Sequence, residues 1–134
     1  MKLILFAASI FALSCPAMAK DFTASENGLI DFDTPSLNMC CTFVPKDNGK
    51  SHLACSRVAP KYWTVDLDQD GKVIHYKNPG EVPGCGYGQP IGNVLNYGET
   101  WTKAGFSCSS SKSGLTCKKG LKGFSLSRRG LKKF

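Results

Sequence analysis

The clearest pattern along the chain is the alternation of apolar and polar residues in short runs, separated by glycine, proline, asparagine and aspartate. Runs rich in valine, isoleucine, threonine and aromatic residues recur between turn signals, and no stretch of a dozen residues has clean helical spacing. Period-two alternation over short runs is typical of half-buried β-strands. The pattern predicts an all-β fold: a small, mostly antiparallel domain over residues 31–134, preceded by an N-terminal arm over residues 20–30.

The best-defined local element is a β-hairpin over residues 62–77. If Asp70-Gly71 forms a two-residue type I′ turn, Leu67 lies opposite Ile74 and Asp66 lies opposite His75. This register separates an apolar face from a polar one, as a half-buried hairpin requires. It also makes Asp66 and His75 a candidate acid–base pair, although a cross-strand polar contact is the more ordinary interpretation.

The same hairpin contains the pattern Asp-x-Asp-x-Asp-Gly, formed by Asp66, Asp68, Asp70 and Gly71. This spacing matches the first half of an EF-hand calcium loop. The twelfth position is Lys77, however, where the motif needs a bidentate glutamate. The turn interpretation is therefore favoured, with calcium as the alternative, and no cofactor is expected.

The N-terminal segment has the pattern of a secretory signal peptide over residues 1–19. Lys2 precedes an apolar run, which is followed by Ala17 and Ala19 at the −3 and −1 positions of a cleavage site. A run of this length is too short to span a bilayer, and no later segment is longer. The sequence thus predicts a periplasmic or secreted protein with no transmembrane segment. The alternative is a lipoprotein acylated at Cys15.

Six cysteines remain after cleavage of this leader, and an even number in a short exported chain predicts up to three disulfides. Zinc is disfavoured because there is no C-x-x-C pair and only two histidines are available. A serine- and glycine-rich loop between Cys108 and Cys117 predicts that these two pair across a hairpin. Either Cys40 or Cys41 is expected to pair with Cys55, which leaves the other for Cys85.

Positive charge is concentrated in the C-terminal third of a chain whose formal net charge is +7. No acidic residue follows Glu99. A basic face of this kind attracts an acidic protein or an anionic component of the cell envelope, or else only keeps the domain in solution. Nucleic acid is not expected, because no binding motif is present. The candidate partner-binding residues are Lys118, Lys119, Lys122, Arg128, Arg129, Lys132 and Lys133.

Candidate chemistry is sparse, and the protein is predicted to have no catalytic residues. No G-x-S-x-G elbow occurs, and disulfide pairing would consume the cysteines that Cys–His chemistry needs. The leading hypothesis is a non-catalytic binding module. A second hypothesis is an inhibitor or immunity protein against a toxin or cell-wall hydrolase, with the loop Glu81-Val82-Pro83-Gly84 inserting into a cleft. A third is a small hydrolase that uses Asp66 and His75.

The chain resembles a largely uncharacterised family of small exported bacterial proteins. Its opening, Phe32-Asp33-Thr34-Pro35-Ser36-Leu37-Asn38-Met39-Cys40, is similar to the family's F-x-[ST]-P-S-x-N-x-x-C, and Gly123-Phe124-Ser125-Leu126-Ser127-Arg128 is similar to its closing G-F-x-L-S-R. The resemblance implies export, disulfides and a β-rich fold, but no activity. A middle segment with a further cysteine is absent here, which implies that Cys85 pairs with the vicinal Cys41.

Overall fold

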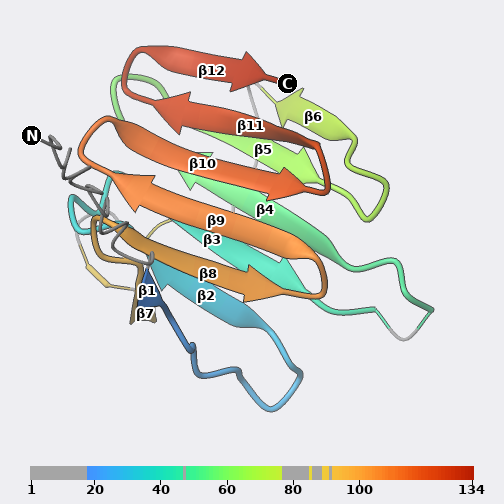
Figure 1. Cartoon of the computed structure of the whole chain (residues 1–134). Helices are drawn as coiled ribbons and strands as arrows, with labels where there is room; N and C mark the ends of the chain where they lie inside the picture. Colours follow the sequence, from blue (N-terminus) through green and yellow to red (C-terminus); the bar gives the residue numbers. More distant parts are fainter. Residues whose placement is uncertain (1–17, 47, 77–84, 86–88, 91) are drawn as a thin grey trace, which may run out of the picture.

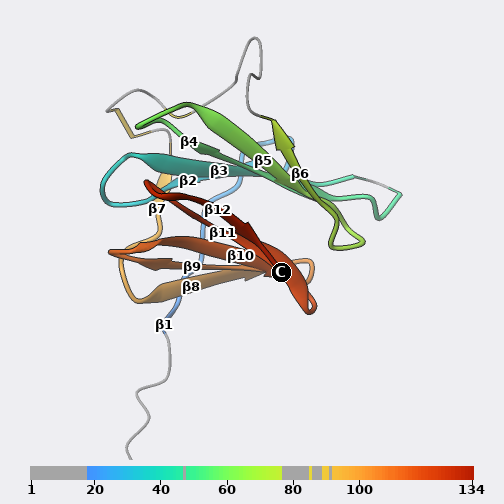
Figure 2. The same ribbon diagram turned by 90° about the horizontal axis from the view of Figure 1, so that it is seen from above.

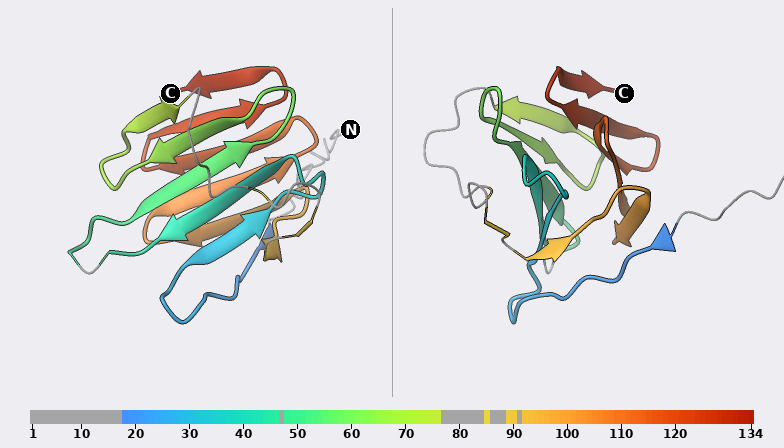
Figure 3. Two further views of the ribbon diagram at one scale, coloured as in Figure 1. Left: turned by 180° about the vertical axis from the view of Figure 1, so that it is seen from behind. Right: turned by 90° about the vertical axis from the view of Figure 1, so that its left-hand side faces the viewer.

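The computed structural model describes residues 18–46, 48–76, 85, 89–90 and 92–134. Within these residues the fold is all-β, as predicted, and two sheets of six strands pack face to face (Figures 2 and 3). No helix that could span a membrane occurs in the described part of the chain. The predicted leader lies almost wholly outside it.

The N-terminal sheet has the order β6-β5-β4-β3-β2-β7 (Figure 1). Its pairs are antiparallel except β2 with β7, which is parallel. Its strands are β2 (Ile30–Asp33), β3 (Met39–Val44), β4 (His52–Arg57), β5 (Trp63–Leu67), β6 (Val73–Tyr76) and β7 (Asn93–Val94).

The C-terminal sheet has the order β1-β8-β9-β10-β11-β12. Four tight antiparallel hairpins form it, and the short β1 adds a parallel edge. Its strands are β1 (Met18–Ala19), β8 (Glu99–Lys103), β9 (Phe106–Ser111), β10 (Gly114–Lys119), β11 (Lys122–Ser127) and β12 (Gly130–Lys133).

The core lies between the two sheets and is built from alternate residues of β2–β5 and β8–β11. Trp101, Phe106, Phe124 and Leu126 of the C-terminal sheet are all at most 2% exposed. Trp101 also meets Phe32 and Phe43 of the other sheet at centroid distances of 5.2 and 5.9 Å. The intervening residues point outward, which satisfies the period-two pattern.

Residues 20–30, set apart in the sequence as an N-terminal arm, contact this core through Phe22. Its ring lies 5.1 Å from that of Phe32 and 6.0 Å from that of Trp101. Thr23 donates its backbone N–H to the side chain of Asn93 at 3.0 Å. The segment thus lies along the edge where β2 and β8 come close.

Three disulfides join the six cysteines that the sequence singled out. Cys41–Cys55 links directly opposite residues of β3 and β4, and Cys108–Cys117 does the same for β9 and β10. The Cα–Cα distance is 4.1 Å in both, close to that of a non-hydrogen-bonded antiparallel pair. The Cys108–Cys117 prediction is confirmed, and Cys41 is the vicinal cysteine that pairs with Cys55.

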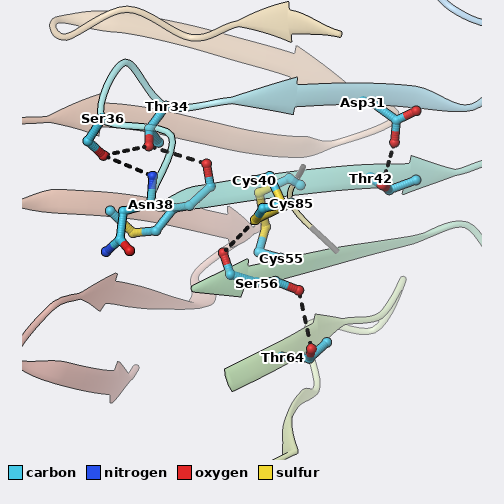
Figure 4. Close-up of a disulfide and its surroundings, with 12 residues drawn as sticks. Asp31, Thr34, Ser36, Asn38, Cys40, Thr42, Cys55, Ser56, Thr64 and Cys85 are labelled. Carbon is cyan, nitrogen blue, oxygen red and sulfur yellow. Dashed lines mark hydrogen bonds between the residues drawn. A yellow bond between two sulfur atoms is a disulfide. The ribbon is translucent and has the colours of Figure 1, made fainter. Parts of the chain in front are cut away.

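The third disulfide, Cys40–Cys85, corrects the pairing of Cys85 with Cys41 that the family resemblance implied. Adjacent residues of a strand point to opposite faces. Cys41 points into the core toward Cys55, so Cys40 lies on the outer face, where Cys85 reaches it (Figure 4). Cys85 also contacts the carbonyl oxygen of Ser56 at 3.7 Å, and Ser56 is only 4% exposed.

The hairpin predicted over residues 62–77 exists, but the predicted register was wrong by one residue. Leu67 pairs with Val73 rather than Ile74, because the N–H of Asp68 donates to the carbonyl of Lys72 and closes a three-residue loop. Gly71 adopts a φ of +82° at the end of this loop, a geometry typical of a type I turn followed by a bulge. The one-residue shift moves every side chain of β6 to the other face.

Gly123 is the position of closest approach between strands in the C-terminal sheet. A Cβ there would lie 2.1 Å from the carbonyl oxygen of Cys117 and 2.7 Å from the Cα of Lys118. Both atoms belong to the backbone of β10 and cannot move aside independently of the strand. The sheet in this form therefore requires glycine at this position.

We expect Gly123→Ala to lower the free energy of unfolding by roughly 1–3 kcal/mol, because the methyl group must separate β10 from β11. Urea denaturation with the disulfides intact measures it. Ser125→Ala on the outer face of the same strand is the control and should cost much less. Equal losses for the two variants would contradict the close approach.

Candidate functional site

One end of the sandwich, at the left in Figure 1, is hollowed into a cleft of about 730 Å³. Turns of both sheets converge there: those between β2 and β3, β9 and β10, and β11 and β12. The volume falls within the range of small-ligand sites. The lining residues are Thr34, Ser36, Leu37, Asn38, Met39, Val58, Tyr97, Ser111, Lys112, Ser113, Gly114, Ser127, Arg128 and Arg129.

The β2–β3 turn forms one wall and is held by side-chain hydrogen bonds (Figure 4). Thr34 donates its hydroxyl to the carbonyl of Met39 at 3.2 Å, and Ser36 accepts the N–H of Asn38 at 3.2 Å. The Asn38 amide bonds both the N–H and the carbonyl of Ala59, at 2.8 and 3.0 Å. Together these hydrogen bonds fix the conformation of the turn.

Leu37 in this turn has a φ of +58°, a left-handed conformation that is uncommon for a residue with a branched side chain. The hydrogen bond from its N–H to the carbonyl of Thr34, at 2.9 Å, closes the turn. Backbone outliers of this kind concentrate at binding and catalytic sites. Leu37 is half-buried and lies in the cleft lining.

The β11–β12 turn forms the opposite wall and is fixed from below by Arg57. This side chain is 2% exposed and crosses from β4 to the other sheet, where it donates to the carbonyl oxygens of Ser127 and Arg128 at 2.9 and 3.4 Å. Its Nε donates to the carbonyl of Lys61 at 3.1 Å, and its guanidinium lies 3.6 Å from the ring centroid of Trp63. Arg57 thereby joins the two sheets beside the cleft.

The charge of Arg57 is solvated by carbonyl dipoles and an aromatic face. Among the described residues, no carboxylate forms an ion pair with it. Burial, followed by the nearby charge of Arg128, lowers the pKa of the Arg57 guanidinium from its usual 12.5. An arginine nevertheless stays charged at physiological pH, so positive potential extends from the interior toward the cleft.

The lining of the cleft combines positive charge with hydroxyl groups. Lys112, Arg128 and Arg129 provide three cations, and no carboxylate is present among the lining residues. Five serine and threonine hydroxyls and the phenol of Tyr97, a residue that is 42% exposed, supply donors and acceptors. This composition favours an anionic ligand that carries many hydroxyl groups.

The seven basic residues predicted to bind a partner do not share one face. Arg128 and Arg129 line the cleft, whereas the β10–β11 hairpin that carries Lys118, Lys119 and Lys122 turns at the opposite end. Consecutive residues of a strand point in opposite directions. Lys132 therefore lies on the outer face opposite Ser125, and Lys133 points inward to the carbonyl of Val73 at 3.4 Å.

Asp66 and His75, the candidate acid–base pair, are not opposite each other. In the corrected register Asp66 faces Ile74, and His75 faces Val65. Asp66 therefore lies on the outer face, while His75 lies on the inner face with its ring 4.7 Å from that of Trp63. The separation removes the geometric basis for the hydrolase hypothesis.

The three aspartates of the candidate calcium loop are also apart. Asp66 belongs to β5, and among the described residues these three carboxylates do not form a group whose oxygens all lie within 4.8 Å of one another. Asp68 accepts the N–H groups of Asp70 and Lys72 at 2.9 and 2.8 Å, so its carboxylate stabilises the turn. The loop Glu81-Val82-Pro83-Gly84 of the inhibitor hypothesis lies outside the described residues.

Residues in and beside the cleft were missed in the sequence. Arg57 is a single charged residue at the end of the apolar strand Leu53-Ala54-Cys55-Ser56-Arg57, and this placement was the available signal. Lys112 and Tyr97 belong to separate turns, and no local pattern indicates that they meet. No family model, curated protein or solved structure matches the chain. Its resemblance to small exported proteins stays a prediction.

Arg57→Lys tests the link between the sheets. A lysine cannot donate to three carbonyls in a planar fork or stack in the same way on Trp63. We expect the free energy of unfolding to fall by roughly 1.5–3 kcal/mol, the range for hydrogen bonds to charged groups. Chemical denaturation measures the loss, and Arg128→Lys at an exposed position should be nearly neutral. A neutral Arg57→Lys would contradict the link.

Asp66→Asn tests how much the ionised, partly buried Asp66 carboxylate lowers the free energy of unfolding. Burial raises the pKa of Asp66 above 3.8, partly offset by the charge of His52. The folded state thus binds the proton more tightly than the unfolded chain, and stability falls as the pH rises through the folded-state pKa. We expect Asp66→Asn to be more stable than the wild type at neutral pH. The gain should vanish as the pH falls below 3.8.

Denaturation of both proteins across this pH range measures the difference. Asp70→Asn, in the adjacent exposed loop, is the control for a general change in net charge. A gain from Asp66→Asn that is the same at low and neutral pH would show that the carboxylate's ionisation is not its cause.

Proposed function

We propose that this chain is an exported, non-catalytic binding protein that holds an acidic glycan in the cleft between its turns. The observation that carries the proposal is the lining of the cleft, which contains Lys112, Arg128, Arg129 and six hydroxyl groups but no carboxylate. Arginine binds carboxylate and sulfate groups through paired hydrogen bonds, and serine and threonine hydroxyls match the donors and acceptors of a sugar.

The walls of the cleft are held before any ligand arrives. Asn38 fixes the β2–β3 turn to Ala59, and Arg57 fixes the β11–β12 turn. A site whose backbone is already ordered loses less conformational entropy on binding. Three disulfides are consistent with an oxidising compartment, where acidic polysaccharides of the cell surface are available.

Titration calorimetry with polygalacturonate, dextran sulfate and neutral dextran tests the proposal. We expect binding to one or both of the acidic polymers and none to dextran. Arg128→Gln combined with Arg129→Gln should weaken binding by at least tenfold, since each lost charged hydrogen bond contributes about 1.5–3 kcal/mol.

The matched control is Lys118→Gln combined with Lys122→Gln, which removes the same charge at the other end of the sandwich. It should retain most of the affinity. Equal weakening by the two double variants would mean that net charge, and not the cleft, attracts the polymer. Binding of neutral dextran with equal affinity would also overturn the proposal.

A further inference from the structure

The end of the sandwich opposite the cleft, at the right in Figure 1, carries an exposed leucine, Leu121, in the turn between β10 and β11. Lys119 pairs with Lys122, which leaves Gly120 and Leu121 as a two-residue connection between β10 and β11. Gly120 has a φ of +63°, and Leu121 is not among the residues with positive φ. These are the features of a type II′ turn, which holds the hairpin closed and directs Leu121 into solvent, where it is 95% exposed.

Lysines surround this apolar tip. Lys119 and Lys122 flank the turn directly, and Lys118 lies on the outer face opposite Gly123. The neighbouring strand β12 runs toward the same end. There the N–H of Phe134 donates to the carbonyl of Gly123 at 3.0 Å, and the N–H of Gly123 donates to the carbonyl of Phe134 at 3.1 Å. Phe134 is 50% exposed and provides a second apolar side chain beside the tip.

Carboxylates near the tip come from the β5–β6 loop, which carries Asp68 and Asp70. Gly71 of this loop approaches β10–β11 so closely that an added Cβ would lie 2.9 Å from the Cβ of Lys122. The Asp68 carboxylate accepts hydrogen bonds from two backbone N–H groups of its own loop. Lys72 in the same loop adds a positive charge. Positive charge therefore remains in excess around Leu121.

We propose that this tip docks on an anionic phospholipid bilayer. Leu121 enters the boundary between headgroups and acyl chains, and Lys118 and Lys122 contact the lipid phosphates. Long lysine side chains can keep their ammonium groups among the headgroups while their methylene stems lie along apolar surface. Because the type II′ turn already presents Leu121, little conformational entropy is lost on docking.

Flotation with vesicles tests the docking surface. The wild-type chain should bind vesicles of phosphatidylglycerol mixed with phosphatidylcholine and not vesicles of phosphatidylcholine alone, with affinity falling at high salt. Leu121→Ser should lower the partition coefficient about tenfold, as expected for one leucine side chain. Lys118→Gln combined with Lys122→Gln should lower it roughly 30-fold, at the contribution expected per lysine near an anionic surface.

Arg128→Gln combined with Arg129→Gln removes equal charge from the cleft end and should change vesicle binding far less. This control also separates the two proposals, because each double variant weakens one interaction and largely spares the other. As a second readout, the fluorescence of Leu121→Trp should shift to the blue when anionic vesicles are added.

Three results would overturn the proposal. One is equal binding to neutral and anionic vesicles. Another is loss of binding in the lysine variant but none in Leu121→Ser, which would indicate a soluble polyanion or an acidic protein as partner. The third is unchanged fluorescence of Leu121→Trp on vesicles that bind the protein.

Discussion

The contact between two disulfides at the centre of the sandwich is the constraint on which the rest of the structure depends. Cys41–Cys55 belongs to one sheet and Cys108–Cys117 to the other, and Cys55 Sγ lies 4.0 Å from Cys117 Sγ across the interface. Each bond joins residues that are directly opposite on neighbouring strands. A slip of one residue would break the pairing and reverse the faces of the strand, so the disulfides fix register as well as stability.

Register matters here because only one face of the C-terminal sheet packs into the core. The outward positions of β9, β10 and β11 carry serine, threonine, lysine and glycine, and Ser110 and Gly123 are buried. The buried face sets the register of these strands, and the Cys108–Cys117 disulfide reinforces it. With the register fixed, the turns align at the two ends: Arg128 and Arg129 join Lys112 at the cleft, and Lys119 and Lys122 flank Leu121.

Local patterns predicted more of the fold than of the site. Alternation gave the strands, and a serine-rich loop between Cys108 and Cys117 was sufficient to pair them. The hairpin register was wrong because Asp70-Gly71 suits both a two-residue turn and a three-residue loop, each with Gly71 at positive φ. In the longer loop the Asp68 carboxylate accepts hydrogen bonds from the N–H groups of Asp70 and Lys72, and the Asp70-Gly71 dipeptide alone does not indicate these bonds. The cleft combines turns distant in sequence, so only tertiary structure brings Lys112 to Arg128.

Arg57 occupies a buried position of β4 where the alternation pattern predicts an apolar residue, and its hydrogen bonds explain why. Methionine could fill the space between Met39 and Trp63, but the carbonyls of Lys61, Ser127 and Arg128 would lose this charged donor, and a hydrogen bond to a charged group contributes about 1.5–3 kcal/mol. The planar guanidinium bonds all three while its face stacks on Trp63. Since no described carboxylate neutralises it, the same side chain that holds the β11–β12 turn also adds positive potential beneath Arg128 and Arg129. One side chain therefore supplies both support for the β11–β12 turn and positive potential beside the cleft.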